Sequence, residues 1–349
     1  MSMNKTGRGM GVLVLGGWLT LLPPATAADN HNAADQDNPL PPELEDAVQN
    51  HGPAGAHPGS VEGQLHHRGS HMTVDCDRAA PGVVQRAIDA SDAGGTILVS
   101  GTCTENIVFP EGKDLLTLDG AGTATIVAAS NDRDTIVVRG RGITVTGVTV
   151  RGGRDTITVS WGSNVLLDGN TVERAGRFGI LVAQVGAAVI INCVVQENAQ
   201  GGIVVAGDSF SFIGFTSSFD TVASPNTVKN NGGNGISLIR NSTARISGNV
   251  IRDNATNGVN VGRASIADLS DNTIDGNGTN GIQVLDGSGV NLGEDTGNTF
   301  QTRPNTTTIP NGQFGVRCAV GGVTDGRLGT LNGTRGAQSY SEGCINSLQ

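Results

Sequence analysis

Arginines gather in one part of this 349-residue chain, and their spacing points to chemistry with an anion. Residues 131–180 contain seven arginines and five acidic residues, although the whole chain has a formal net charge of −10. Arg133, Arg154 and Arg177 are 21 and 23 residues apart, and each lies three residues before an isoleucine. Arginine binds carboxylates and sulfates through two parallel hydrogen bonds. If the chain coils at this interval, the three side chains stack as a column that could bind an acidic ligand.

A second interpretation of these arginines is structural. Asp134 and Asp155 directly follow Arg133 and Arg154, which would allow exposed ion pairs between successive turns, each worth roughly 0–1 kcal/mol. Both interpretations remain open. Arg151 and Arg174 share another register, and Trp161 could stack on a sugar or pack in a loop. The candidate ligand-binding residues are therefore Arg133, Arg139, Arg154, Arg174, Arg177 and Trp161.

The histidines exclude two classes of enzyme chemistry. They are His31, His51, His57, His66, His67 and His71. A folded body beyond residue 72 consequently has no Ser-His-Asp triad and no histidine-ligated zinc site. Cys193 has no histidine partner there, so we expect a small buried residue rather than a nucleophile.

No metal site or cofactor is predicted, and calcium has one weak candidate. Asp271, Asp275 and Asn277, with Gly276 and Gly278 between and after them, resemble a calcium-binding turn. The nonapeptide calcium repeat is missing, so ordinary turn chemistry explains these residues better.

The elements that must position these residues come from a repeat. A Gly/Thr-Ile/Val-x-Val/Leu motif recurs with its second position at Ile136, Ile157, Ile180, Ile203, Ile236, Val259 and Ile282. A second column consists of Gly147, Asn170, Cys193, Asn226, Asn249, Asn272 and Asn298. Both columns contain one step of 33 residues, which is one period of 23 plus a ten-residue insertion near four phenylalanines. A repeat of this length indicates a solenoid.

The predicted fold is all-β, a single-stranded right-handed parallel β-helix of about eight to ten turns, or rungs. The 53 glycines suit its tight turns, and a narrow stacked interior suits an aromatic content of only 3%. Strand alternation would point Thr135, Val137 and Arg139 outward. On the middle rungs it would expose Leu181, Val204 and Ile239, which the phenylalanine-rich insertion or a second chain in an oligomer could cover.

Residues 75–345 resemble the pectin lyase-like β-helix superfamily. Residues 81–90 (PGVVQRAIDA) are similar to its amphipathic N-terminal capping helix, and residues 94–102 (GGTILVSGT) to its first strand and turn. The resemblance implies a groove along one strand face that acts on acidic polysaccharides through lyase, hydrolase or epimerase chemistry. In its lyases an arginine or lysine can accept a proton. The Asn-Thr-Asp, Gly-His-Gly and Asp-Pro-His signatures of its enzymes are absent, so no catalytic residues carry over.

The remaining cysteines suit an exported protein, which can keep disulfides. A Cys76–Cys103 bond would join the cap to the first strand, and Cys318–Cys344 would close the C-terminal end. Connectivity does not follow from sequence alone.

The N-terminal region predicts export. Residues 1–28 have the basic, apolar and small-residue order of a secretory signal peptide, with a membrane anchor as the alternative. Residues 29–74 form an expected disordered tail rich in acidic residues, proline and glycine. Residues 75–349 form the β-helix, with no other transmembrane candidate, and the expected location is secreted or periplasmic.

Two functions remain for the body. One is a protein that binds, and in its enzymatic form cleaves or modifies, an acidic polysaccharide. The other is a non-catalytic, adhesin-like scaffold that acts by protein or glycan binding. No basic and aromatic surface suggests nucleic acid as a partner.

Overall fold

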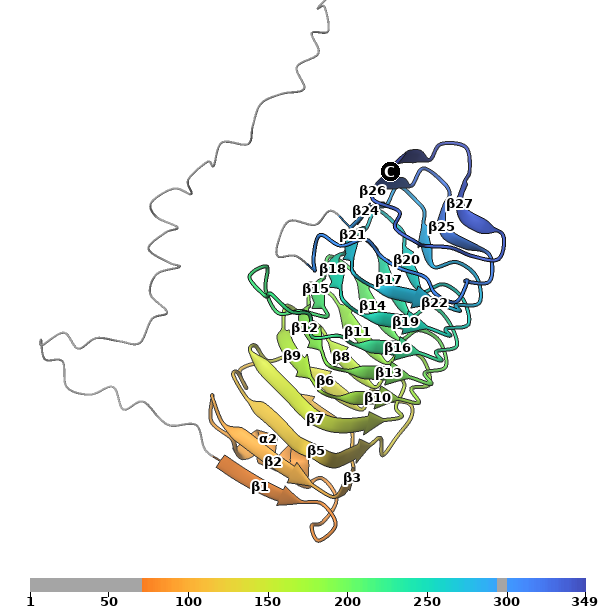
Figure 1. Ribbon diagram of the computed structural model, residues 1–349. Coiled ribbons are helices and arrows are strands. Elements are labelled where there is room, and N and C mark those ends of the chain that lie inside the picture. Colours follow the sequence, from red (N-terminus) through yellow and green to blue (C-terminus); the bar gives the residue numbers. More distant parts are fainter. Residues whose placement is uncertain (1–70, 294–299) are drawn as a thin grey trace, which may run out of the picture. The chain divides into compact units, whose positions relative to one another are not determined.

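The computed structural model describes residues 71–293 and 300–349, which stack as a parallel β-solenoid (Figure 1). The predicted right-handed parallel β-helix is confirmed. It has about 12 turns rather than eight to ten. The count from sequence missed rungs that depart from the repeated motif, among them those of Ile107 and Val316, which pair in register with Ile136 and Ile282.

The strands form two parallel sheets. The ten-stranded sheet contains β4 (Ile107–Phe109), β6 (Ile136–Val138), β8 (Ile157–Val159), β11 (Ile180–Ala183), β14 (Ile203–Ala206), β17 (Ile236–Ile239), β20 (Val259–Val261), β23 (Ile282–Val284), β25 (Phe314–Cys318) and β27 (Gly336–Tyr340). The eighteen-stranded sheet consists of two stacks of strands, each forming one face of the solenoid. The long strands β5 (Thr117–Val127) and β7 (Ile143–Arg151) run through both stacks and join them.

One face of the larger sheet adds β1 (His71–Asp75), β2 (Thr96–Ser100), β9 (Asn164–Asp168), β12 (Ala187–Ile191), β15 (Phe210–Ile213), β18 (Thr243–Ser247), β21 (Ile266–Ser270), β24 (Gly289–Leu292), β26 (Val323–Gly326) and β28 (Ile345–Leu348). The other adds β3 (Thr102–Thr104), β10 (Thr171–Glu173), β13 (Val194–Gln196), β16 (Thr227–Lys229), β19 (Val250–Arg252) and β22 (Thr273–Asp275).

The repeated isoleucine column forms the core. Ile136 pairs in register with Ile157, which pairs with Ile180, and all three are fully buried. Each rung of this column therefore places a branched aliphatic side chain on another branched aliphatic side chain. The same register stacks every outward residue of the ten-stranded sheet on the residue one rung away.

Ladders of asparagine side chains form hydrogen bonds from rung to rung in the buried turns. The side chains of Asn226 and Asn249 each hydrogen-bond the next asparagine, at 2.9 and 3.0 Å. The predicted last member, Asn298, lies outside the described residues. Asn272 instead donates to Asn305 at 2.8 Å, because a second longer step interrupts the period there. A further ladder that the sequence analysis missed comprises Asn198, Asn231, Asn254, Asn277 and Asn311.

The residue before each anchor isoleucine faces inward, so its predicted outward direction is wrong. Thr135 is fully buried, and its hydroxyl donates to the Gly152 carbonyl at 2.9 Å. On later rungs this position is glycine. A Cβ at Gly179 would lie 2.6 Å from Asn198 Nδ2, because the strand bends here against the asparagine ladder. Simple alternation fails at the bend.

Helix α2 (Val83–Ala90) buries Val84, Ala87 and Ile88 near the first rung, consistent with the predicted cap. The Glu105 carboxylate accepts hydrogen bonds from the backbone amides of Val84 and Gln85 at the start of the helix. The two predicted disulfides are present. Cys76–Cys103 and Cys318–Cys344 have Cα separations of 5.1 and 6.1 Å.

The predicted signal peptide and most of the tail lie outside the described residues. Strand β1 already pairs with β2 from His71 onward, before the expected start of the body at residue 75. Within the described ranges, no helix has the length and apolar character needed to cross a bilayer.

Candidate functional site

A groove of about 750 Å3 crosses the outer face of the ten-stranded sheet. Outward side chains of consecutive strands line it: Val137 on β6, Thr158 on β8, Leu181 on β11 and Val204 on β14. Their backbones pair in register, so the groove follows the stacking direction. It takes in five of the six predicted ligand-binding residues, and Arg174 alone is not among its lining residues.

Arg154 is held by the carboxylate of the preceding rung. Its Nε and Nη2 lie 2.9 and 3.1 Å from the two oxygens of Asp134. Asp134 also accepts a hydrogen bond from the Thr158 hydroxyl at 2.9 Å, and only 6% of its side chain is exposed. Pairing between rungs was one of the two interpretations, but the carboxylate is buried rather than exposed. The pair therefore positions one face of the guanidinium and leaves 54% of the side chain open to the groove.

Arg177 repeats this arrangement one rung later. Its Nε lies 2.9 Å from Asp155 Oδ1, its Nη2 contacts the second oxygen, and the Asp155 side chain is fully buried. The backbone amide of Phe178 donates to the same carboxylate. The hydrogen bonds that Arg177 donates to the Asp155 carboxylate raise the pKa of Arg177 above its usual value. Arg177 thus stays charged, and this argues against its acting as a proton acceptor.

Of the five arginines that line the groove, three have no such partner within the described part of the chain: Arg133, Arg139 and Arg240. Neither Arg133, on the loop before β6, nor Arg139, directly after β6, pairs with a described carboxylate. The position equivalent to Asp134 one rung earlier is Glu105, whose carboxylate is occupied by the capping helix. Arg133 therefore keeps its donors for solvent or ligand.

Trp161 borders the groove with an exposed ring. It follows β8, and 67% of its surface is accessible. Its φ of 62° places a bulky side chain in the left-handed region, which costs backbone energy unless the turn requires it. An exposed indole ring at the edge of a groove lined by arginines is where a ring that stacks on a sugar would have to lie.

Sequence reasoning missed Arg240 and Gln184, which also line the groove. Gln184 directly follows Ala183, and Arg240 directly follows Ile239. Ala183 and Ile239 stand at the same position of their rungs in the register of β11, β14 and β17, so both residues occupy the turn position that Trp161 holds on an earlier rung. Counting one residue past each strand in the repeat could have found both.

Arg174 lies elsewhere. It is in the turn after β10 and forms an exposed ion pair with Glu197, with Nε and Oε2 3.1 Å apart. The proposed register of Arg151 with Arg174 is wrong by one residue, because Arg151 pairs with Glu173 across β7 and β10. Arg151 and its partner Glu173 are 22 residues apart, one fewer than the 23-residue period, so counting by 23 reaches Arg174 instead.

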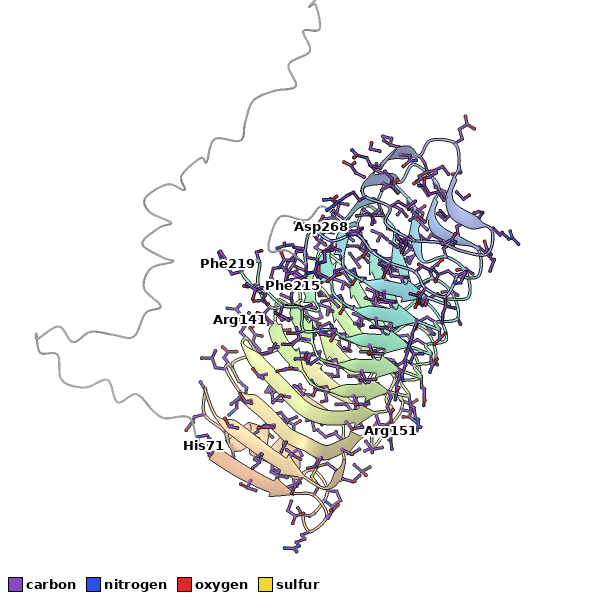
Figure 2. The ribbon with its side chains drawn as sticks, viewed as in Figure 1. His71, Arg141, Arg151, Phe215, Phe219 and Asp268 are labelled. Atoms are coloured by element: carbon purple, nitrogen blue, oxygen red, sulfur yellow. A yellow bond between two sulfur atoms is a disulfide. The ribbon has the colours of Figure 1, made fainter. Side chains whose placement is uncertain are left out.

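The four phenylalanines do not cover the groove. Phe210 and Phe212 lie on β15 of the larger sheet, and the Phe212 and Phe215 ring centroids are 5.0 Å apart. Figure 2 shows Phe215 and Phe219 at the edge of the stack away from Arg151. Val204, expected to be exposed, is only 3% accessible because it lies at the bottom of the groove.

The calcium-like turn is engaged by protein groups. Asp275 accepts hydrogen bonds from the amide and hydroxyl of Thr308, both at 2.7 Å. Asp271 contacts Arg303, and Asn277 belongs to an asparagine ladder. These contacts explain the residues as turn-forming.

Cys193 is a buried member of the first ladder. Its thiol hydrogen-bonds the Leu167 carbonyl, and burial raises its pKa to about 12. We expect one thiol to react with a maleimide or disulfide reagent in denaturant at pH 8, and none in the folded protein. Five reactive thiols in denaturant would refute both disulfides.

Residues 117–312, more than half of the chain, match the family described as periplasmic copper-binding protein (NosD). The chain belongs to this NosD family. Its location is accordingly periplasmic or secreted, as the sequence predicts.

Copper, named in the description of the NosD family, prefers histidine, cysteine and methionine ligands. Residues 71–293 and 300–349 contain no group of three or more His, Cys, Asp or Glu side chains arranged to hold a metal. Cys193, the free thiol of this part, is buried and protonated at neutral pH. The described residues therefore do not fit a copper site.

Among solved structures, a pectate lyase shares the fold of this NosD-family chain, and two further structures are also similar to the chain. Pectate lyase Pel9A is 14% identical, covers 80% of this chain and 78% of its own, and has a TM-score of 0.57. The periplasmic alginate epimerase AlgG is 15% identical, with coverages of 80% and 72% and a TM-score of 0.48. An alginate lyase from Paenibacillus sp. is 15% identical, with coverages of 79% and 99% and a TM-score of 0.46. No curated protein sequence matches the chain.

Proposed function

We propose that the protein binds an acidic polysaccharide in the groove of the ten-stranded sheet. The observation that carries the proposal is the row of guanidinium groups along a groove that contains five arginines and two aspartates. Arg133 and Arg139 have free donors, and the exposed ring of Trp161 adds a stacking surface. Adjacent parallel strands are about 4.8 Å apart, so Arg133, Arg154 and Arg177 form a ladder suited to a polymer with repeating carboxylates.

The groove supports binding better than cleavage. Hydrolysis of a glycosidic bond needs two carboxyl groups with separate roles. Of the two carboxylates that line the described groove, Asp134 is committed to Arg154 and Thr158. Arg154 and Arg177 are themselves ion-paired. Hydrolysis would release new reducing ends, and β-elimination would give ultraviolet absorbance from unsaturated uronates. We expect neither when the protein is incubated with alginate or polygalacturonate, with or without calcium.

The proposal is tested by the affinity of the full chain for alginate and polygalacturonate. We expect Arg133→Gln and Arg139→Gln each to weaken binding by about tenfold, because each removes a charged hydrogen-bond donor without orphaning a carboxylate. Arg174→Gln is the matched control, since it removes an arginine from an exposed pair outside the groove. Equal affinities for all three variants and the unaltered chain would refute the proposed site.

A further inference from the structure

The groove is divided into two chemically different halves. Around β6 and β8 its lining carries the charged and polar side chains of Arg133, Arg139, Arg154, Thr158 and Ser160, together with Val137 on the floor. Over β11, β14 and β17 the lining side chains that belong to the strands are entirely apolar. They are Leu181, Ala183, Val204, Ala206 and Ile239.

The division runs along the groove in strict register. Thr158 lies beside Leu181, which lies beside Val204, so the Thr158 hydroxyl is followed by apolar floor side chains on β11 and β14. Phe178 adds an aromatic ring to the boundary, with the Arg177 guanidinium 4.8 Å from its centroid. The polar side chains of the apolar half, Gln184 and Arg240, belong to the turns after the strands rather than to the floor.

An unmodified uronate chain fits only the first half. Sugar hydroxyls pressed against Leu181 and Val204 would lose hydrogen bonds to water and find no side-chain partner on the floor. Small apolar substituents would instead bury their surface there, which is favourable. The two halves thus complement a polymer that carries both charge and ester-bound apolar groups.

We infer that the preferred ligand is an acidic polysaccharide substituted with short acyl or alkyl esters, with free carboxylates over β6 and β8 and ester groups over β11 to β17. This inference rests on the proposed function and adds the class of polymer. Arg133 and Arg139 bind the charge, while Leu181, Val204 and Ile239 select the substituent. Four of the five groove arginines lie at the end over β6 and β8 or at its boundary, and Arg240 is the one at the other end.

The test compares chemically O-acetylated alginate with the same sample after mild alkaline removal of the esters. We expect the unaltered protein to bind the acetylated polymer about tenfold more tightly, since each acetyl group buries a methyl and a carbonyl carbon. Leu181→Thr reproduces on β11 the residue present on β8 and should abolish this preference while retaining affinity for the de-esterified polymer. Ile239→Thr is a second variant at the far end of the apolar half, and thermal melting checks that both are folded.

The outcomes separate this inference from the proposed function. Arg133→Gln should weaken binding of both polymers by the same factor. Equal affinity of the unaltered protein for both polymers, or a preference that survives in Leu181→Thr and Ile239→Thr, overturns the inference and leaves acidic-glycan binding intact. Binding of neither polymer overturns both. Binding only to phosphatidylglycerol vesicles would also overturn both, because the two halves would then match a lipid headgroup and its chains.

Discussion

Replacing Gly202 with alanine is expected to lower the free energy of unfolding by about 3 kcal/mol, because the added methyl group has no space. An ideal Cβ at this position lies 2.6 Å from the Gly235 carbonyl oxygen and 2.7 Å from Val228 Cγ1. It also lies 2.8 Å from Asn231 Nδ2, a donor in the second asparagine ladder. The backbone of the neighbouring rung cannot withdraw without breaking its own ladder. Urea denaturation measures the loss as a lower midpoint.

Gly289 provides the matched control for this substitution. It lies on β24, and a Cβ there meets nothing within 4 Å. Alanine at an unstrained glycine restricts the unfolded chain, so Gly289→Ala should leave the urea midpoint unchanged or raise it slightly. If both alanine variants shift the midpoint equally, steric exclusion between rungs is not the reason for the glycine column.

Removing Arg177 is expected to destabilise the fold by about 3 kcal/mol, because it leaves a fully buried Asp155 carboxylate with only the Arg154 guanidinium, 4.0 Å away. Arg133→Ala, in the same column, should change the free energy of unfolding by no more than about 0.5 kcal/mol, since no described carboxylate depends on Arg133. Chemical denaturation of the two variants gives the comparison. Asp155→Asn combined with Arg177→Ala should recover part of the loss, because a neutral amide tolerates burial better than a carboxylate.

The two arginine variants also separate structure from binding. Arg177→Ala lowers stability and disturbs the groove, so weaker glycan binding by that variant has two causes. Arg133→Ala preserves stability and should still lose affinity. An Arg177→Ala variant as stable as Arg133→Ala would contradict the structural role of the Asp155 pair.

Local periodicity explains how much of the fold could be predicted from sequence. The isoleucine column marks one residue of each rung, and the structure stacks Ile136, Ile157 and Ile180 as that spacing requires. Errors arose where the period changed. Asn298 was placed in the ladder by counting, whereas the chain makes a longer step to Asn305. The inward turn of Thr135 was also missed, because alternation describes a straight strand and this residue lies at a bend.

The candidate site divides in the same way. The stacking of Arg133, Arg154 and Arg177 follows from the repeat, so the sequence by itself determined that a column of cations would exist. It could not determine which of them are paired, because Asp134 reaches Arg154 across rungs and Glu105 is diverted to the helix. Counting along the repeat puts Arg240 in the register of Trp161, but it does not show that the Arg240 side chain lines the same groove as Arg133. The coil is determined by short-range repetition, whereas the free charges and the apolar floor depend on which side chains of neighbouring rungs meet, and only the tertiary structure decides that.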